Sequence, residues 1–153
     1  MKTKRLSTFS LLLVLFVSCD IIPLPPKVTP DKGLVIDNRR FSLSAQGGSV
    51  VATFTGYNVW VILGCTEYLY VDNIWKEIGS TYDEGMGITL SDNKCMLSGS
   101  WYSAYKPEEK DGQYANELLI SVSKNDTGTQ RRVLIYLGDG PNTDSITVTQ
   151  EAN

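Results

Sequence analysis

Residues 118–150 read LLISVSKNDTGTQRRVLIYLGDGPNTDSITVTQ, and this stretch decides the fold class. It contains three runs in which apolar and polar side chains alternate, a pattern typical of β-strands that bury one face. The residues on the expected buried face are Leu118, Ile120, Val122, Val133, Ile135, Leu137, Ile146 and Val148. Turn-forming residues separate the runs at 125–128 and 138–142. The stretch therefore predicts antiparallel strands joined by short turns.

The same alternation occurs earlier in the chain. Within residues 49–55, Val50, Ala52 and Phe54 take one face of a predicted strand. Further turn signals are Gly47-Gly48, Asp72-Asn73 and Asp92-Asn93. No helical stripe lasts for more than about two turns. Many short strands with regularly spaced turns predict an all-β protein, with one antiparallel β-sandwich domain over residues 33–153.

The first 18 residues have the order of a lipoprotein signal peptide. A basic start is followed by the apolar run 11–17, and the small Ser18 comes directly before Cys19. This order predicts cleavage before Cys19, which then carries the lipid. The alternatives are an ordinary cleaved signal peptide and a membrane-spanning helix. A span needs about 20 apolar residues, and the charged Asp20 comes too soon for one.

Residues 19–32 are rich in proline and follow no period. Because proline favours extended backbone, this stretch predicts a semi-rigid tether between the lipid and the domain. With the lipid as the expected membrane anchor, we expect the protein in the cell envelope. It would be attached to the outer membrane, on the periplasmic face or at the cell surface.

The charge balance argues against a nucleic-acid partner. The full chain has 14 basic and 17 acidic residues. Removing residues 1–18 takes away three of the 14 basic residues, and the remaining 11 against 17 give a net charge of −6. Nucleic-acid binding needs clustered Lys and Arg. Here the adjacent arginines form only two isolated pairs, Arg39-Arg40 and Arg131-Arg132.

The chain contains no histidine. This excludes Ser-His-Asp and Cys-His catalysis and removes the commonest metal ligand, so we expect no cofactor and no metal site. The acidic pairs Asp83-Glu84 and Glu108-Glu109 are possible hydrolytic carboxylates, and the first is also a possible calcium ligand. Nothing in the sequence fixes the separation of these carboxylates. We therefore interpret them as solvated loop charge and expect no enzymatic activity.

Two cysteines remain beyond Cys19, namely Cys65 and Cys95. An even pair in an exported protein predicts a disulfide. Such a bond would stabilise the fold by roughly 3–4 kcal/mol if the geometry permits it. The alternative is two buried free thiols that act as small apolar side chains.

The strand and turn motifs of the second half resemble those of a known family. An Asn125-Asp126-Thr127-Gly128 turn precedes a strand that starts at Arg131, and the last strand, 145–150, ends in Val-Thr-Gln. Over residues 35–150 the chain resembles the BACON domain (Bacteroidetes-associated carbohydrate-binding often N-terminal). The resemblance implies an immunoglobulin-like sandwich, with residues 61–100 as an insertion between the early and late strands. It also implies an association with glycan-degrading machinery.

Several motif residues have an expected structural role. Asn125 and Gly128 suit a turn with left-handed backbone angles. Gln150 on the last strand can satisfy backbone groups that an edge would leave open. Arg131 and Arg132 point to opposite faces of one strand, so one covers apolar surface with its stem and the other meets solvent.

Exposed aromatic side chains are the candidates for glycan contact, because they stack on sugar rings. The candidates are Trp75, Trp101, Tyr102, Tyr105 and Tyr114. The alternative is that these residues are core, as aromatics in a sandwich often are, with Trp60 and Trp101 filling the space between the sheets. The residues predict a non-catalytic, lipid-anchored protein, and the resemblance implies an accessory module that contacts a glycan or glycoprotein. A structural spacer or protein-interaction domain is the alternative.

Overall fold

The computed structural model describes residues 34–55, 60–82, 86–108, 116–140 and 142–153. The predicted signal peptide (1–18), Cys19 and the tether (19–32) lie outside the described residues. So do Asp83-Glu84, Glu109 and Tyr114. Within the described part of the chain, no helix is long and apolar enough to cross a membrane.

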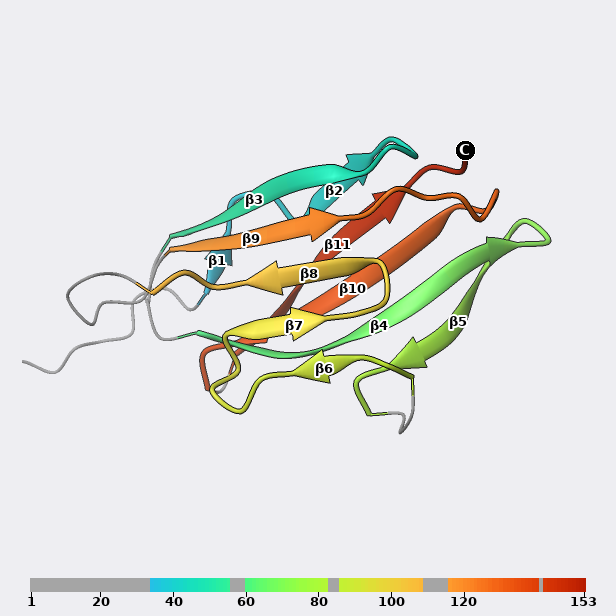
Figure 1. Cartoon of the computed structure of the whole chain (residues 1–153). Helices are drawn as coiled ribbons and strands as arrows, with labels where there is room; N and C mark the ends of the chain where they lie inside the picture. The colour runs from blue at the N-terminus through green and yellow to red at the C-terminus, as the bar shows by residue number, and fades with distance from the viewer. Residues whose placement is uncertain (1–33, 56–59, 83–85, 109–115, 141) are drawn as a thin grey trace, which may run out of the picture.

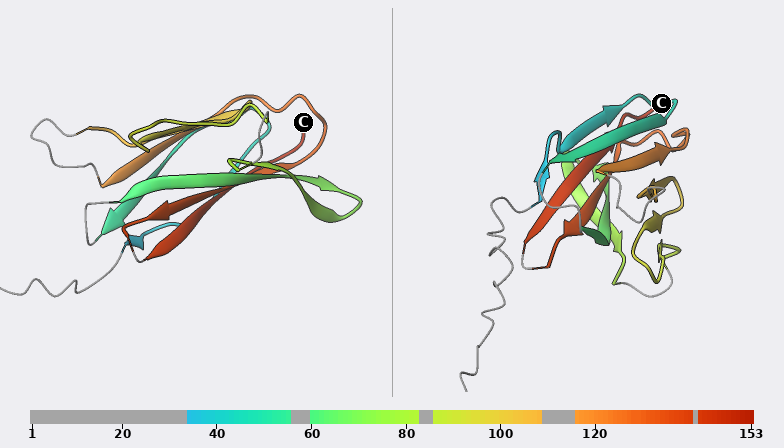
Figure 2. Two further views of the ribbon diagram at one scale, coloured as in Figure 1. Left: turned by 90° about the horizontal axis from the view of Figure 1, so that it is seen from below. Right: turned by 90° about the vertical axis from the view of Figure 1, so that its left-hand side faces the viewer.

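Eleven strands make up the described structure. In chain order they are β1 (Val35–Ile36), β2 (Arg40–Leu43), β3 (Gly48–Thr55), β4 (Val61–Val71), β5 (Ile74–Ser80), β6 (Thr89–Leu90), β7 (Met96–Ser98), β8 (Tyr102–Tyr105), β9 (Glu117–Val122), β10 (Arg131–Gly138) and β11 (Thr143–Gln150). They form a six-stranded sheet of order β1-β3-β9-β8-β7-β6 and a five-stranded sheet of order β2-β11-β10-β4-β5 (Figure 1). The sheets face each other as two layers (Figure 2).

The strand order is that of an immunoglobulin-like sandwich. Such folds place strands A, B, E and D in one sheet and G, F and C in the other. Here β1, β3, β9 and β8 occupy the first set of places, and β11, β10 and β4 occupy the second. The prediction of an all-β, immunoglobulin-like sandwich is therefore confirmed. One pair departs from the antiparallel prediction, because β2 runs parallel to β11 after the chain crosses from one sheet to the other.

The expectation of an insertion over residues 61–100 is wrong for its first part, because β4 takes the place of strand C of the sandwich itself. The strands that follow β4 extend both sheets. The long strand β4 is an interior strand of the five-stranded sheet, and β5 forms its edge. The short strands β6 and β7 continue the six-stranded sheet beyond β8. The β4–β5 hairpin projects past the ends of the neighbouring strands (Figure 1).

The core lies between the sheets and has the predicted composition. Every residue of the expected buried face in residues 118–150 is buried, as are Ala52 and Phe54 of β3. Trp60 immediately precedes β4, is fully buried and stacks on Phe54, with ring centroids 4.4 Å apart. Trp60 and Trp101 therefore fill the inter-sheet space, as the core interpretation predicted.

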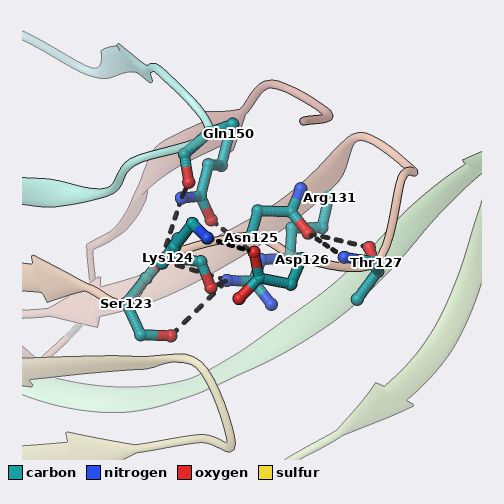
Figure 3. A network of polar contacts seen from close by, with 8 residues as sticks. Ser123, Lys124, Asn125, Asp126, Thr127, Arg131 and Gln150 are labelled. Atoms are coloured by element: carbon teal, nitrogen blue, oxygen red, sulfur yellow. Dashed lines mark hydrogen bonds and ion pairs between the residues drawn. The ribbon is translucent and has the colours of Figure 1, made fainter.

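A buried polar network fastens the last strand to the loops around it (Figure 3). Gln150 is fully buried, and its amide nitrogen donates to the carbonyl oxygens of Ser44, Ala45 and Ser123. Its oxygen accepts from Nε of Arg131 at 2.8 Å. Gln150 satisfies backbone groups as predicted, but β11 is an interior strand, and the carbonyl oxygens that it binds lie in the loops after β2 and β9.

The turn after β9 was predicted correctly at one of its two positions. Gly128 has φ +68°, the left-handed conformation expected of it. The left-handed prediction for Asn125 is wrong, because its φ is not positive. Its side chain supports the turn instead: Nδ2 donates to the carbonyl oxygens of Thr129 and Glu151, both at 2.8 Å, and Oδ1 accepts from Thr127.

Candidate functional site

Trp101 and Tyr102 cannot serve as a sugar-stacking platform. They retain only 6% and 4% of their surface. In β8, alternation places Tyr102 and Ala104 inside and Ser103 and Tyr105 outside. Arg131 covers Trp101, with its Cζ 4.5 Å from the ring centroid. The stacking prediction is therefore wrong for these two residues, which belong to the core.

Trp75 and Tyr105 do not share a face. Tyr105 is 43% exposed on the outer face of the six-stranded sheet. Trp75 lies in the edge strand of the five-stranded sheet and is half-buried. The two residues belong to opposite layers, so the predicted common aromatic platform is not formed.

Trp75 instead belongs to a cluster that the register of three strands brings together. Arg132 of β10 pairs with Tyr68 of β4, and Tyr70 of β4 pairs with Trp75 of β5. Directly opposed residues point to the same side of a sheet. Arg131 and Val133 face the core, so this set faces outward.

The cluster is held together by ring and guanidinium contacts. Cζ of Arg132 lies 3.8 Å from the centroid of the Trp75 ring, a cation–π contact. The Tyr70 and Trp75 rings are tilted by 51°, with centroids 5.1 Å apart. Nε of Arg132 donates to Oγ1 of Thr149 at 3.3 Å. Trp75 is thus a fixed part of the surface, with one ring face occupied by Arg132.

A depression of about 440 Å³ adjoins this cluster over β2, β11 and β10. Its lining consists of Arg40, Phe41, Ser42, Arg132, Leu134, Thr147 and Thr149. No carboxylate lines it. Partial burial lowers the pKa of the Arg132 guanidinium, and the nearby positive charge of Arg40 lowers it further. We call the set Arg40, Tyr68, Tyr70, Trp75 and Arg132 the arginine–aromatic face.

A second depression on the same sheet has one carboxylate in its lining, that of Glu77. It is lined by Leu63, Thr66, Glu77, Ser80, Tyr82, Tyr136 and Thr143. Glu77 pairs with Tyr68 across the β4–β5 ladder. Burial raises the pKa of Tyr68, and the charges of Tyr136 and Glu77 add to this effect. Within the described ranges, no three Cys, Asp or Glu residues gather as a metal site would require.

Sequence reasoning missed most of the arginine–aromatic face. Tyr68 and Tyr70 are two residues apart, which signals a shared face of one strand. Arg131 and Arg132 were expected on opposite faces without saying which meets solvent, and the structure buries Arg131 and leaves Arg132 half-buried on the outer face. The missing information was which strands lie beside β4, and spacing within one strand does not carry it.

The predicted disulfide between Cys65 and Cys95 is wrong. Both thiols are free and buried. The amide nitrogen of Ile62 donates to the carbonyl oxygen of Lys94, which places Cys95 beside Ile62. Cys65 lies three residues further along β4, or about 10 Å at the usual rise per residue. A disulfide needs Cα atoms within about 7 Å.

The Cys65 thiol has polar partners in the core. Its Sγ lies 2.9 Å from the hydroxyl of Tyr102 and 3.4 Å from Oγ1 of Thr81. Burial raises the pKa of the Cys65 thiol above its ordinary value of 9.0. Burial, and then the contact with Cys65, raises the pKa of Tyr102 well above its ordinary value of 10.0. Both groups are therefore neutral in the folded protein.

This buried pair predicts a loss of stability in alkali. The unfolded chain releases these protons near pH 9 and pH 10, and the folded chain keeps them. The stabilisation is complete below pH 9 and declines above it, by up to about 1.4 kcal/mol per pH unit for each retained proton. Urea unfolding at several values between pH 8 and pH 11 measures the slope.

Tyr102→Phe should make that slope shallower above pH 10 by about 1.4 kcal/mol per pH unit. Tyr105→Phe is the matched control, because Tyr105 lies in the same strand with its side chain exposed. It should keep the slope of the unmodified protein. Equal slopes for the unmodified protein and Tyr102→Phe would contradict the assignment.

Comparison with known proteins supports the fold and goes no further. No protein-family model matches the chain, and no curated protein matches it. An NMR structure of a protein from Bacteroides thetaiotaomicron is similar, with 17% identity and a TM-score of 0.53, over 85% of this chain and 96% of that chain. A structure of murine CRIg matches with 6% identity and a TM-score of 0.32, over 80% of this chain and 99% of the other. The first match shows a shared fold, and the second is too distant to support an argument.

Proposed function

We propose that this protein is a non-catalytic, lipid-anchored module of the cell envelope that contacts glycans through the arginine–aromatic face. The observation that carries the proposal is the clustering of Tyr68, Tyr70 and Trp75 beside two arginines on one outer sheet face. Aromatic rings pack against the apolar faces of sugars, while guanidinium and hydroxyl groups bind sugar oxygens. The resemblance to BACON domains in sequence motifs supports the same role.

The lack of a carboxylate pair on this face supports a non-catalytic role. Glycoside hydrolysis commonly uses two carboxyl groups about 5–10 Å apart. Of the residues that line the two depressions of the described outer face, Glu77 alone carries a carboxylate. The face is therefore suited to holding a glycan and not to cleaving one.

Trp75→Ala should weaken glycan binding about tenfold or more, a change of roughly 1.4 kcal/mol. The substitution removes the ring and also releases Arg132, which lies on it. Tyr105→Ala is the control, since this exposed aromatic lies on the opposite sheet and should leave the affinity unchanged. The measurement is a glycan array with the purified protein, followed by titration calorimetry on the glycans that bind.

Two results would count against the proposal. One is an array in which no glycan binds. The other is an equal loss of affinity in Trp75→Ala and Tyr105→Ala. That result would mean that the glycan binds outside the arginine–aromatic face or binds non-specifically.

Cys19→Ser tests the envelope location. Without the thiol, no lipid is attached, so the variant should move from the membrane fraction to the soluble fraction. Cell fractionation with immunoblotting measures this distribution. Persistent membrane association of the variant would refute the lipid anchor.

A protein-interaction role is the second candidate, and one observation favours it. An apolar row crosses the outer face of the six-stranded sheet, with Val51 beside Leu119, Leu119 beside Tyr105 and Tyr105 beside Met96. These four side chains are between 37% and 47% exposed. A contiguous apolar patch of this kind is typical of protein contact. Failure of every glycan to bind would favour this candidate.

A further inference from the structure

The two arginines of the arginine–aromatic face differ from their neighbours in the chain. Arg39 forms an ion pair with Asp144 at 2.7 Å, and Arg131 is buried against Gln150. Among the described residues, Arg40 and Arg132 have no carboxylate within ion-pair distance. The chain carries 17 acidic residues against 14 basic ones. Two adjacent cations without a counter-charge are therefore a specific feature of this face.

The sheet register lets the two guanidinium groups approach each other. Arg40 pairs with Thr147, and Arg132 pairs with Thr149, so the two arginines lie diagonally across β11. Two strand spacings and two residues along the strand put their Cα atoms about 12 Å apart. The long side chains of the two arginines can extend toward each other across this distance. Both arginines line the same depression, together with the hydroxyl groups of Ser42, Thr147 and Thr149.

Arg132 is already held in place for binding. Its Cζ lies 3.8 Å from the centroid of the Trp75 ring, and its Nε donates to Oγ1 of Thr149. In the described structure its two terminal nitrogens donate to no protein group. A planar guanidinium with free terminal nitrogens binds a carboxylate or sulfate through two parallel hydrogen bonds. A side chain that is fixed in advance loses less freedom when the ligand binds.

We infer that this face takes an acidic glycan, whose carboxylate or sulfate group binds between Arg40 and Arg132 while its sugar ring lies against Tyr70 and Trp75. The inference rests on the proposed function and specifies its ligand class. The hydroxyl groups of Ser42 and Thr147 bind the remaining sugar oxygens. A carboxylate and a sulfate group both present an anion on a sugar, and the experiment below distinguishes between them.

The test is titration calorimetry of the whole protein with three matched probes. They are galacturonate oligosaccharides, the same oligosaccharides after reduction of their carboxyl groups, and sulfated galactose oligosaccharides. The acidic probes should bind about tenfold more tightly than the reduced probe, or roughly 1.4 kcal/mol. Raising the ionic strength should weaken the binding of the acidic probes and leave the binding of the neutral probe unchanged.

Arg40→Gln and Arg132→Gln should each remove most of the preference for the acidic probe. Arg39→Gln is the matched control, since it makes the same charge change next door at an arginine already paired with Asp144. It should leave the preference within about twofold of the unmodified protein. Arg40 is exposed, so its variant keeps the test valid even if Arg132→Gln disturbs the packing of Trp75.

The outcomes are distinguishable. Equal affinity for the acidic and reduced probes overturns this inference and leaves the glycan proposal standing. The same loss in Arg39→Gln as in Arg40→Gln also overturns it, because the effect is then one of net charge. Binding of none of these probes or of any array glycan overturns both. Preference for only the carboxylate or only the sulfated probe supports the inference and identifies the anion.

Discussion

Gln150→Leu is expected to lower the free energy of unfolding by about 3–5 kcal/mol. Leucine fills a similar volume but makes none of the four hydrogen bonds of the Gln150 amide. One of these bonds comes from the charged Arg131, whose Nε would be left buried without an acceptor. A buried donor that loses its partner costs its full desolvation penalty. Urea unfolding followed by tryptophan fluorescence measures the difference.

Gln130→Leu is the matched control for this variant. Gln130 lies immediately before β10 and donates to the Glu151 carboxylate at an exposed site. Exposed polar contacts contribute little, so we expect a change within about 0.5 kcal/mol. A loss of less than 1 kcal/mol in Gln150→Leu would mean that the network of Figure 3 has no stabilising role.

Gly47→Ala is expected to destabilise the fold by about 3 kcal/mol or more. Gly47 has φ +77°, and a Cβ atom there would lie 2.3 Å from the carbonyl oxygen of Val122. The same atom would lie 2.8 Å from the carbonyl carbon and oxygen of Ser123. These are backbone atoms next to the β3–β9 ladder, so they cannot move without breaking strand pairing. Thermal and urea unfolding measure the loss.

Gly128→Ala separates the contact from the backbone strain. Gly128 has φ +68°, close to that of Gly47, but a Cβ atom there meets nothing within 4 Å. Only the left-handed backbone conformation then disfavours alanine, so we expect the free energy of unfolding to fall by about 1 kcal/mol. An equal loss of stability in Gly47→Ala and Gly128→Ala would show that the close approach of Gly47 to Val122 adds nothing to the cost of the substitution.

The fold was predictable because its signal is local. Each strand from 118 to 150 alternates with period two, so Ile120, Ile135 and Ile146 could be placed in the core before any pairing was known. Turn residues marked most strand ends in the same way. The parallel pairing of β2 with β11 was not predictable, because it joins segments about 100 residues apart and neither strand encodes its partner.

The candidate site was predictable only in part, for a related reason. Trp75 was a candidate from the sequence, and its pairing with Tyr70 places it on the outer face, where it is half-buried and not the most exposed residue of β5. Tyr102 was misplaced because the sequence does not fix where β8 begins, and a shift by one residue exchanges the two faces. Arg40 and Arg132 lie on the two strands that flank β11, and only the sheet register shows that they are close.

The parallel pairing of β2 with β11 has a mechanical consequence. The start of β2 at Arg40 lies beside Thr147, and its end at Leu43 lies beside Gln150. A pull that draws residue 40 one way and residue 150 the other acts along both strands in opposite directions. The interstrand hydrogen bonds then share the load and must break together, instead of opening one after another from an end. Tension applied between residues 40 and 150 thus loads this strand pair in shear.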